Sequence, residues 1–425
     1  MRAARQECCR LTPRVTAFTN LPGPAEALAR YLDAVRLSPR GVETVPVAEG
    51  LDRVLAADLV AGTDQPPFPR SAVDGWALRA ADTAIATAAA PVILRAAGAV
   101  PMGAAATAAV APGLAVRVPT GGMLPPGADA VAMQEEVEAA SGTVAVRRPV
   151  RAGENVVDRG IDVRAGETLL PRGRRLRPAD LGVLAGQGAA RIEVTLPPRV
   201  AILATGNEVV PPDVPLGPGQ VHDMNSAALA GAVRAAGGLP TVLGIVPDER
   251  GAVEDALRRA LAGHEMVLVS GGSSVGERDV VAEAIDALGP PGVLVHGVAV
   301  RPGKPTVLAA AGAVPVLGLP GNPVSALVIF ELFARPVLDR LLGADPRTGP
   351  WRTVRARAAS ALEGTKGRED HRRVRLETRG AEIWAVALPA GSQVLTSLVR
   401  ADGIVALPPG SRVAEGEEVE VRLLG

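Results

Sequence analysis

Alternation of apolar strands with helices after residue 199 constrains the fold of this chain more than any other feature. Runs at 199–206, 240–247 and 265–272 are almost continuously apolar, and a helical pattern of crossover length follows each of them. Strands that are apolar on both faces and joined by helices form a parallel sheet covered on both sides. We therefore expect residues 198–345 to form an α/β domain with a central parallel sheet.

The rest of the chain divides where its apolar pattern changes. Apolar residues recur at helical spacing over 25–37, and short apolar runs broken by Pro and Gly follow from 61 to 150. Short alternating strands return after residue 350, and 425 residues exceed one compact core. We expect a flexible extension at 1–24, a helical linker domain made of 25–60 with 151–197, a β domain at 61–150, and a small C-terminal β-barrel at 346–425.

Charge and cysteine content exclude several classes of protein. Lys and Arg together number 45, and so do Asp and Glu, which argues against a nucleic-acid or acidic-membrane partner. The cysteines, Cys8 and Cys9, are adjacent, so we expect no disulfide framework. No run of about eighteen apolar residues occurs, which excludes a membrane-spanning helix. We expect a cytoplasmic protein.

Polar residues follow the predicted strands of the α/β domain, at the points where the strands end. Thr205, Gly206 and Glu208 follow the first strand, and Asp248 follows the second. The third strand runs into a glycine-rich loop that leads to Asp279. Because the carboxyl ends of parallel strands share one edge of the sheet, where ligands bind, we expect these residues to lie close together.

The grouped carboxylates of Glu208, Asp248 and Asp279 predict a divalent cation at this edge. Two carboxylates with phosphate oxygens and water suit Mg²⁺. Helix capping is the alternative for Asp248 and Asp279, because each stands where a predicted helix begins. The glycine-rich loop offers unhindered backbone N–H groups ahead of a helix, which favours an anion. Its candidate residues are Gly271, Gly272, Ser273, Ser274 and Gly276.

Two cations and a second rigid loop lie further along the same domain. Arg301 and Lys304 stand on a turn stiffened by prolines, and Lys304 is the only lysine of the domain. A tight strand-to-helix connection is the alternative for the rigid loop, but it does not explain the paired cations. We expect an oxyanion to bind here. The loop offers Pro320, Gly321, Asn322, Pro323 and Ser325.

The motifs of this chain, taken as a series, resemble the molybdopterin molybdenumtransferases, the family that includes the E domain of gephyrin. Alone, the segments around Asp74 and Thr120 indicate only turn-rich β structure. The ordered series spans about residues 25–424 and is highly specific. It consists of PPFPRSAVDGWALRAADT, VRVPTGGMLPPGADAV, GENVVDRGIDV, LATGNEVV, SGGSSVGERD, RPGKP, GLPGNPVSA and GSQVLTSLVRADGIVALPPG.

The resemblance implies an elongated homodimer and a reaction. Each chain is implied to have a helical linker region, a β domain, an α/β domain related to the molybdopterin adenylyltransferases, and a C-terminal β domain. The active site is implied to lie between the α/β domain of one chain and the β domain of the other. The implied reaction inserts molybdate into adenylated molybdopterin and releases AMP with the help of Mg²⁺.

The resemblance also implies roles for single residues. Glu208 and Asp279 match the carboxylates on the Mg²⁺ side, with Asp248 beside them. Positions contributed by the N-terminal part correspond to Asp74, Thr120 and Asp162. The implied oxyanion site comprises Arg301, Lys304, Ser325, Arg373 and Ser397, on a loop shaped by Pro320 and Pro323.

Two other functions compete with this interpretation. The α/β domain alone is typical of an adenylyltransferase that acts on molybdopterin and ATP, but the additional β domain and Asp74 argue against it. A non-catalytic, gephyrin-like scaffold is the second alternative, and the retained Asp248, Asp279 and Lys304 argue against lost catalysis. The sequence leaves the choice between molybdate and tungstate open. The upstream molybdopterin adenylyltransferase is a candidate protein partner.

Overall fold

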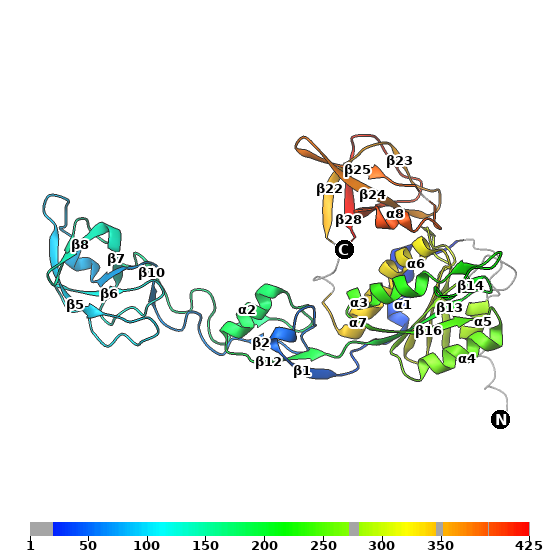
Figure 1. The fold of residues 1–425 in the computed structure, drawn as a ribbon, viewed down its shortest axis with the longest axis horizontal. Helices are drawn as coiled ribbons and strands as arrows, with labels where there is room; N and C mark the ends of the chain where they lie inside the picture. The colour runs from blue at the N-terminus through cyan, green and yellow to red at the C-terminus, as the bar shows by residue number, and fades with distance from the viewer. Residues whose placement is uncertain (1–19, 272–279, 346–351, 390, 425) are drawn as a thin grey trace, which may run out of the picture.

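The computed structural model describes residues 20–271, 280–345, 352–389 and 391–424 of the chain. The molecule is elongated: the α/β and C-terminal domains lie together at one end, and the β domain lies at the other, beyond a slender connection (Figure 1). No helix in these ranges is long and apolar enough to cross a membrane.

A mixed sheet forms the centre of the α/β domain. In order across the sheet, the strands are β16 (Leu239–Val246), β13 (Arg199–Thr205), β17 (Met266–Ser270), β21 (Val314–Leu319), β20 (Val307–Ala311) and β18 (Pro291–His296). The first four are parallel, as the alternation of strands and helices predicts. Two further strands, β20 and β18, which the sequence pattern does not predict, run antiparallel to their neighbours and extend the sheet at one edge.

Helices cover both faces of this sheet. One face packs against α3 (Asn225–Ala235) and against a continuous helical run made of α6 (Pro323–Ile329), the π-helix η4 (Phe330–Ala334) and α7 (Arg335–Leu342). The other face packs against α4 (Arg250–Leu261) and α5 (Val280–Asp286). A short pair, β14 (Val209–Val210) and β15 (Val221–His222), follows the end of β13. The inner parallel strands β13, β17 and β21 are therefore buried on both faces, whereas the edge strand β16 keeps exposed residues.

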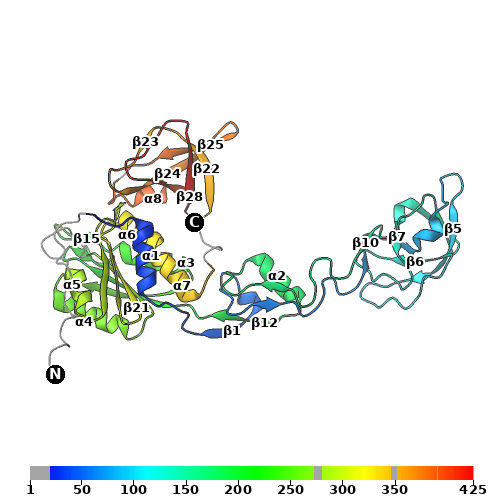
Figure 2. The same ribbon diagram turned by 180° about the vertical axis from the view of Figure 1, so that it is seen from behind.

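The first helix, α1 (Pro24–Ala34), belongs to the core of the α/β domain. Its apolar residues Ala27 and Tyr31 are fully buried there, and the Tyr31 hydroxyl donates to the Ala309 carbonyl at 2.8 Å. Figure 2 shows α1 beside α6 and α7. The helix predicted near residue 25 is present, but it packs against the α/β domain and not with residues 151–197.

A small linker domain connects the α/β domain with the β domain. Its core buries Leu55, Leu176 and Leu184. The elements are β1 (Val42–Pro46) paired with β12 (Arg191–Thr195), β2 (Leu59–Val60) paired with β11 (Thr168–Leu170), the 3₁₀ helix η1 (Val47–Glu49) and α2 (Pro178–Gly186). Short strands thus accompany the helix that the sequence predicts.

The β domain is built on one six-stranded sheet in the described part of the chain. Its strands, in order, are β7 (Ala130–Met133), β4 (Gly75–Leu78), β6 (Leu114–Val118), β5 (Val92–Ala99), β9 (Thr143–Val146) and β8 (Val137–Ala140). Two 3₁₀ helices, η2 (Ala80–Thr83) and η3 (Gln134–Glu136), lie beside it. A short pair, β3 (Arg70–Ser71) with β10 (Val156–Val157), joins this domain to the linker.

The C-terminal domain is a small closed β-barrel. Strands β24 (Glu369–Arg379), β25 (Glu382–Ala387), β22 (Thr353–Ala358), β28 (Glu418–Leu423) and β26 (Gly403–Leu407) pair in that order, and β26 pairs with β24 to close the ring. The remaining elements are β23 (Leu362–Glu363), β27 (Arg412–Val413) and α8 (Thr396–Val399). Strand β19 (Val300–Arg301) of the α/β domain pairs with β24. This pairing fixes the barrel beside the turn that carries Arg301 and Lys304.

Candidate functional site

A cavity of about 650 Å³ opens at the carboxyl ends of β13, β17 and β21. We call it the carboxylate cavity, because Glu208, Asp223 and Asp248 line it while no Lys or Arg of the described chain does so. Its wall also includes Thr205, Gly206, His222, Asn225, Ser270, Gly271, Gly321, Asn322, Pro323 and Gln393. The sheet edge where the sequence predicts ligand binding therefore carries a cavity.

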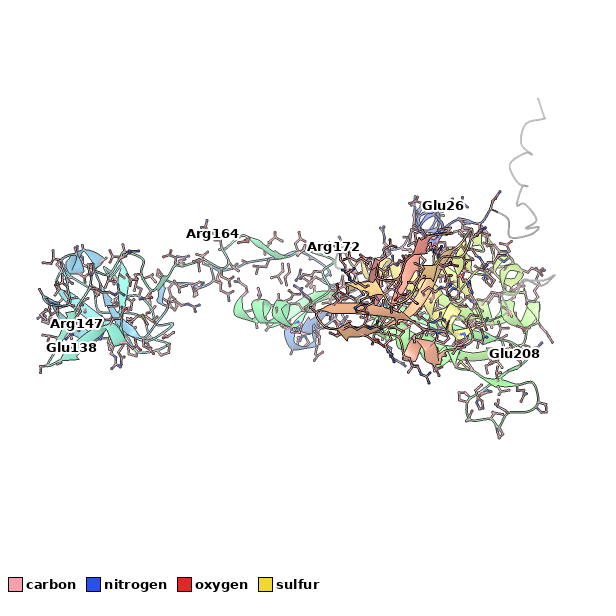
Figure 3. All side chains as sticks on the ribbon, turned by 90° about the horizontal axis from the view of Figure 1, so that it is seen from above. Glu26, Glu138, Arg147, Arg164, Arg172 and Glu208 are labelled. Atoms are coloured by element: carbon pink, nitrogen blue, oxygen red, sulfur yellow. The ribbon has the colours of Figure 1, made fainter. Side chains whose placement is uncertain are left out.

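Local hydrogen bonds orient the carboxylates of this cavity. The Thr205 hydroxyl donates to Asp248 Oδ1, and the Asp248 backbone N–H donates to Asn207 Oδ1 at 3.3 Å. Asp223 Oδ1 accepts the backbone N–H of Ser226 at 3.0 Å and so caps α3. Glu208 is exposed, on the α/β end of the molecule (Figure 3). Asp248 is fixed by its neighbours, whereas Glu208 is open to a ligand.

The donor set of this cavity fits Mg²⁺. Glu208 and Asp248 provide the hard carboxylate oxygens that Mg²⁺ takes together with phosphate and water. Among the residues that the structure describes, no group of three or more His, Cys, Asp or Glu forms a complete metal site. The second predicted metal ligand, Asp279, lies outside the described residues, as do Gly272, Ser273, Ser274 and Gly276.

Gly271 stands where no side chain fits. Its φ is +103°, a conformation that disfavours residues with a Cβ atom. A Cβ atom added there would lie 2.0 Å from the Thr205 carbonyl oxygen. The strands β13 and β17 can therefore bring their ends together only around a glycine.

We expect Gly271→Ala to lower the thermal unfolding midpoint and to weaken nucleotide binding. Both the backbone strain and the clash with Thr205 push the strand ends apart, and the strain alone is about 1–2 kcal/mol. Gly231→Ala is the matched control, because a Cβ atom there meets nothing within 4 Å and Ala favours the helix. Calorimetric melting and AMP titration check both variants. Equal behaviour of the two variants would contradict the steric account.

A second cavity, of about 430 Å³, adjoins the first. We call it the cation cavity, because Arg301, Lys304 and Arg368 line it and no Asp or Glu of the described chain does. The remaining lining comes from Val300, Pro302, Gly303, Pro305, Pro320, Gly321, Asn322, Ser325, Gly391, Ser392 and Gln393. Three cations around one small space attract an anion.

Contacts with the barrel hold Arg301 at this cavity. Arg301 Nη1 donates to Thr365 Oγ1 at 2.8 Å and lies 3.7 Å from Asp370 Oδ2. Thr365 in turn donates to Asp370 at 2.9 Å, and Asp370 is buried. The guanidinium is therefore anchored on one side, and 44% of the side-chain surface stays exposed.

Arg373 and Ser397 are buried in the C-terminal domain and do not line the cation cavity. Arg373 is 2% exposed, and Nη2 donates to the Pro389 carbonyl at 2.7 Å and to the Gly391 carbonyl at 3.3 Å. Burial lowers the pKa of this guanidinium, repulsion from Arg372 adds to the effect, and attraction to the Asp370 carboxylate opposes it. Ser397 Oγ donates to the Val394 carbonyl at 2.6 Å.

The two cavities share one wall. Gly321, Asn322 and Gln393 line both of them. The first helical N–H beyond this wall, that of Val324, donates to the Ser392 carbonyl at 3.1 Å. That N–H is therefore already used by a barrel carbonyl.

The residues predicted in the N-terminal part lie elsewhere in the chain. Asp74 and Thr120 are in the β domain, where Asp74 Oδ1 accepts the Thr120 backbone N–H at 2.8 Å. Asp162 is exposed in the connection between β domain and linker domain. Figure 3 shows the β domain, labelled at Glu138 and Arg147, at the opposite end from Glu208. Within one chain, the structure does not bring these three residues to the cavities.

Several lining residues escaped the sequence analysis. Asp223 stands just before the helix α3 and Asn225 stands at its start, positions that indicate capping alone. Arg368 and Gln393 belong to the barrel, and no periodic pattern shows that the barrel contributes to a site on another domain. For Gln393 a signal existed, because it stands in the GSQVLTSL segment with Ser397.

Three protein families match consecutive parts of the chain. The family described as "MoeA N-terminal region (domain I and II)" matches residues 23–188. The family described as "Probable molybdopterin binding domain" matches residues 201–340, and the one described as "MoeA C-terminal region (domain IV)" matches residues 355–424. The last two matched ranges contain all the residues named as lining the two cavities.

Similar proteins cover almost the whole chain. Molybdopterin molybdenumtransferase 2 of Mycobacterium tuberculosis (strain ATCC 25618 / H37Rv) is 35% identical over 89% of this chain and 94% of its own. Molybdopterin molybdenumtransferase of Bacillus subtilis (strain 168) is 34% identical over 90% of both chains. A crystal structure of the molybdopterin biosynthesis MoeA protein of Pyrococcus horikoshii OT3 is 32% identical, covers 95% of this chain and 100% of its own, and has a TM-score of 0.82.

Proposed function

The chain belongs to the MoeA family of molybdopterin molybdenumtransferases, and from this premise we propose that it inserts molybdate into adenylated molybdopterin and releases AMP. The observation that carries the proposal is the contact between two cavities of opposite charge. One is lined by carboxylates and the other by cations, and they share Gly321, Asn322 and Gln393. A substrate with a phosphate at one end and an oxyanion acceptor at the other fits such a pair.

Each cavity serves one end of the proposed substrate. Glu208, with Asp279 as the predicted second ligand, would hold Mg²⁺ in the carboxylate cavity, and Asp248 lies beside them. When bound, Mg²⁺ supplies positive charge to the phosphate that leaves as AMP. Thr205 keeps the Asp248 carboxylate oriented by its hydroxyl donation, and Gly271 lets the ends of β13 and β17 meet at the wall of this cavity.

The cation cavity serves molybdate. Molybdate is a tetrahedral dianion, and Arg301, Lys304 and Arg368 surround a space that no described carboxylate enters. Buried Arg373 holds the 389 and 391 carbonyls, so that Gly391 keeps its place in the wall. Charge developing on the oxyanion side is stabilised by cations that are already in position.

We also propose that the active enzyme is a homodimer with sites completed between chains. Asp74 and Thr120 belong to the β domain and Asp162 to its connection with the linker domain, and the β domain lies at the opposite end of the molecule from the α/β domain that carries the cavities (Figure 1). A twofold arrangement would bring the β domain of one chain to the cavities of the other. We place the reaction in the cytoplasm, with the upstream molybdopterin adenylyltransferase as the protein that delivers the substrate.

The test is release of AMP from adenylated molybdopterin by the purified full-length protein. We expect AMP release to require Mg²⁺ and to increase with molybdate, and a parallel series with tungstate determines the choice of oxyanion. A control supplies molybdopterin and ATP. Pyrophosphate release in that control, without molybdate-dependent AMP release in the main assay, would refute the proposal in favour of an adenylyltransferase. Release of neither AMP nor pyrophosphate would favour a scaffold.

A further inference from the structure

We propose that Asn225 is a positioning residue whose side-chain amide holds the wall between the two cavities and thereby controls oxyanion binding. This inference rests on the function proposed above for the cation cavity. Asn225 lies at the start of α3, lines only the carboxylate cavity, and is 9% exposed. Its effect on the cation cavity is therefore indirect.

Two hydrogen bonds make Asn225 a crosslink between strand ends. Nδ2 donates to Ser270 Oγ at 2.8 Å and to the Gly321 carbonyl at 2.7 Å. Ser270 ends β17, and Gly321 follows β21. A carbonyl oxygen only accepts, so Gly321 determines which end of the amide faces it. Both Nδ2 protons are used, and the amide cannot be turned over without losing these bonds.

The crosslink acts on loops that already touch. The Gly271 N–H donates to the Leu319 carbonyl at 3.1 Å, and a Cβ atom on Gly321 would lie 3.5 Å from Gly271 Cα. The backbone is thus packed on one side of Gly321, and Asn225 bonds its carbonyl on another. The loop has one preferred position while the amide is present.

The same loop supplies much of the cation cavity. Pro320, Gly321, Asn322 and Ser325 belong to its wall, whereas Asn225 does not. Removal of the amide leaves the Gly321 carbonyl without its donor, and a carbonyl in that state moves toward water. Such a shift displaces the loop relative to Arg301 and Lys304, which spoils the fit around a small tetrahedral anion.

Molybdate titration by calorimetry tests the proposal on the full-length protein with AMP present. We expect Asn225→Ala to raise the molybdate Kd on the order of tenfold, while the thermal midpoint changes by only a few degrees. Ser226→Ala is the matched neighbour: Ser226 is 5% exposed and its hydroxyl has no partner in the described part of the chain. That control should bind molybdate as the wild type does.

Asn225→Asp separates the donors from the bulk of the side chain. Aspartate keeps the size of the side chain but places an oxygen, in place of Nδ2, opposite the Gly321 carbonyl. We therefore expect Asn225→Asp to bind molybdate at least as weakly as Asn225→Ala does. This variant provides the test if the alanine variant does not fold. Wild-type molybdate affinity in either folded variant overturns the inference alone. Failure of the wild type to bind molybdate overturns both the inference and the function proposed for the cation cavity.

Discussion

Mixed dimers of Asp74→Asn and Asp279→Asn chains recover AMP release that neither variant has alone. Each substitution keeps the shape of the side chain and removes one charge, Asp74 from the β domain and Asp279 from the predicted metal site. In a hybrid dimer with sites between chains, one site carries both changes and the other carries neither. Random exchange makes half of the dimers hybrids with one intact site, so we expect roughly a quarter of the wild-type rate.

The matched control mixes two variants damaged in the same half of the site. Glu208→Gln and Asp279→Asn both change the α/β domain, so every site of their hybrid dimer carries one damaged carboxylate. We expect no recovery from that mixture. Absence of recovery from the Asp74 and Asp279 mixture, with subunit exchange demonstrated by mass spectrometry, would place the whole site within one chain.

Lys304→Ala raises the molybdate concentration needed for half-maximal AMP release by about ten- to a hundredfold. The reason is the loss of a charged donor from a cavity whose lining holds few cations, a loss of about 1.5–3 kcal/mol. Lys304→Arg should restore only part of the affinity, because a planar guanidinium approaches two oxygens side by side and not one corner of a tetrahedron. Initial rates over a molybdate series check both variants.

Lys366 provides the control for Lys304. It is the other lysine of the chain, is exposed, and is absent from the wall of the cation cavity. Lys366→Ala should leave the molybdate dependence unchanged, which shows that net charge alone is not the cause. If Lys304→Ala instead weakens AMP binding and leaves the molybdate dependence intact, Lys304 serves the phosphate and the oxyanion lies elsewhere.

The residues at the strand ends are the part of the site that the sequence predicts best. The apolar runs mark where β13 and β17 stop, so the sequence placed Thr205, Glu208 and Gly271 at one edge, and the structure finds them around one cavity. The same rule missed Arg368 and Gln393. They reach the cation cavity because β19 pairs with β24 across two domains, a contact that no local pattern encodes.

Two features of the fold show where local patterns stop being informative. Strands β20 and β21 are separated by only two residues, Gly312 and Ala313, and so short a connection forces an antiparallel pair. The pattern of crossover helices predicts parallel strands and does not indicate this hairpin. For α1, periodicity defined the apolar face, but the choice of core depends on tertiary packing around Tyr31.

The proposed function couples phosphate release in the carboxylate cavity to molybdenum uptake in the cation cavity of one protein. Its most direct test is a single-turnover reaction of wild-type protein with adenylated molybdopterin, Mg²⁺ and molybdate. The AMP released and the molybdenum retained in the purified pterin product are measured in the same sample. We predict equal amounts of both, one molybdenum for each AMP. Stoichiometric AMP release with a pterin product free of molybdenum would show that the protein does not couple the two steps.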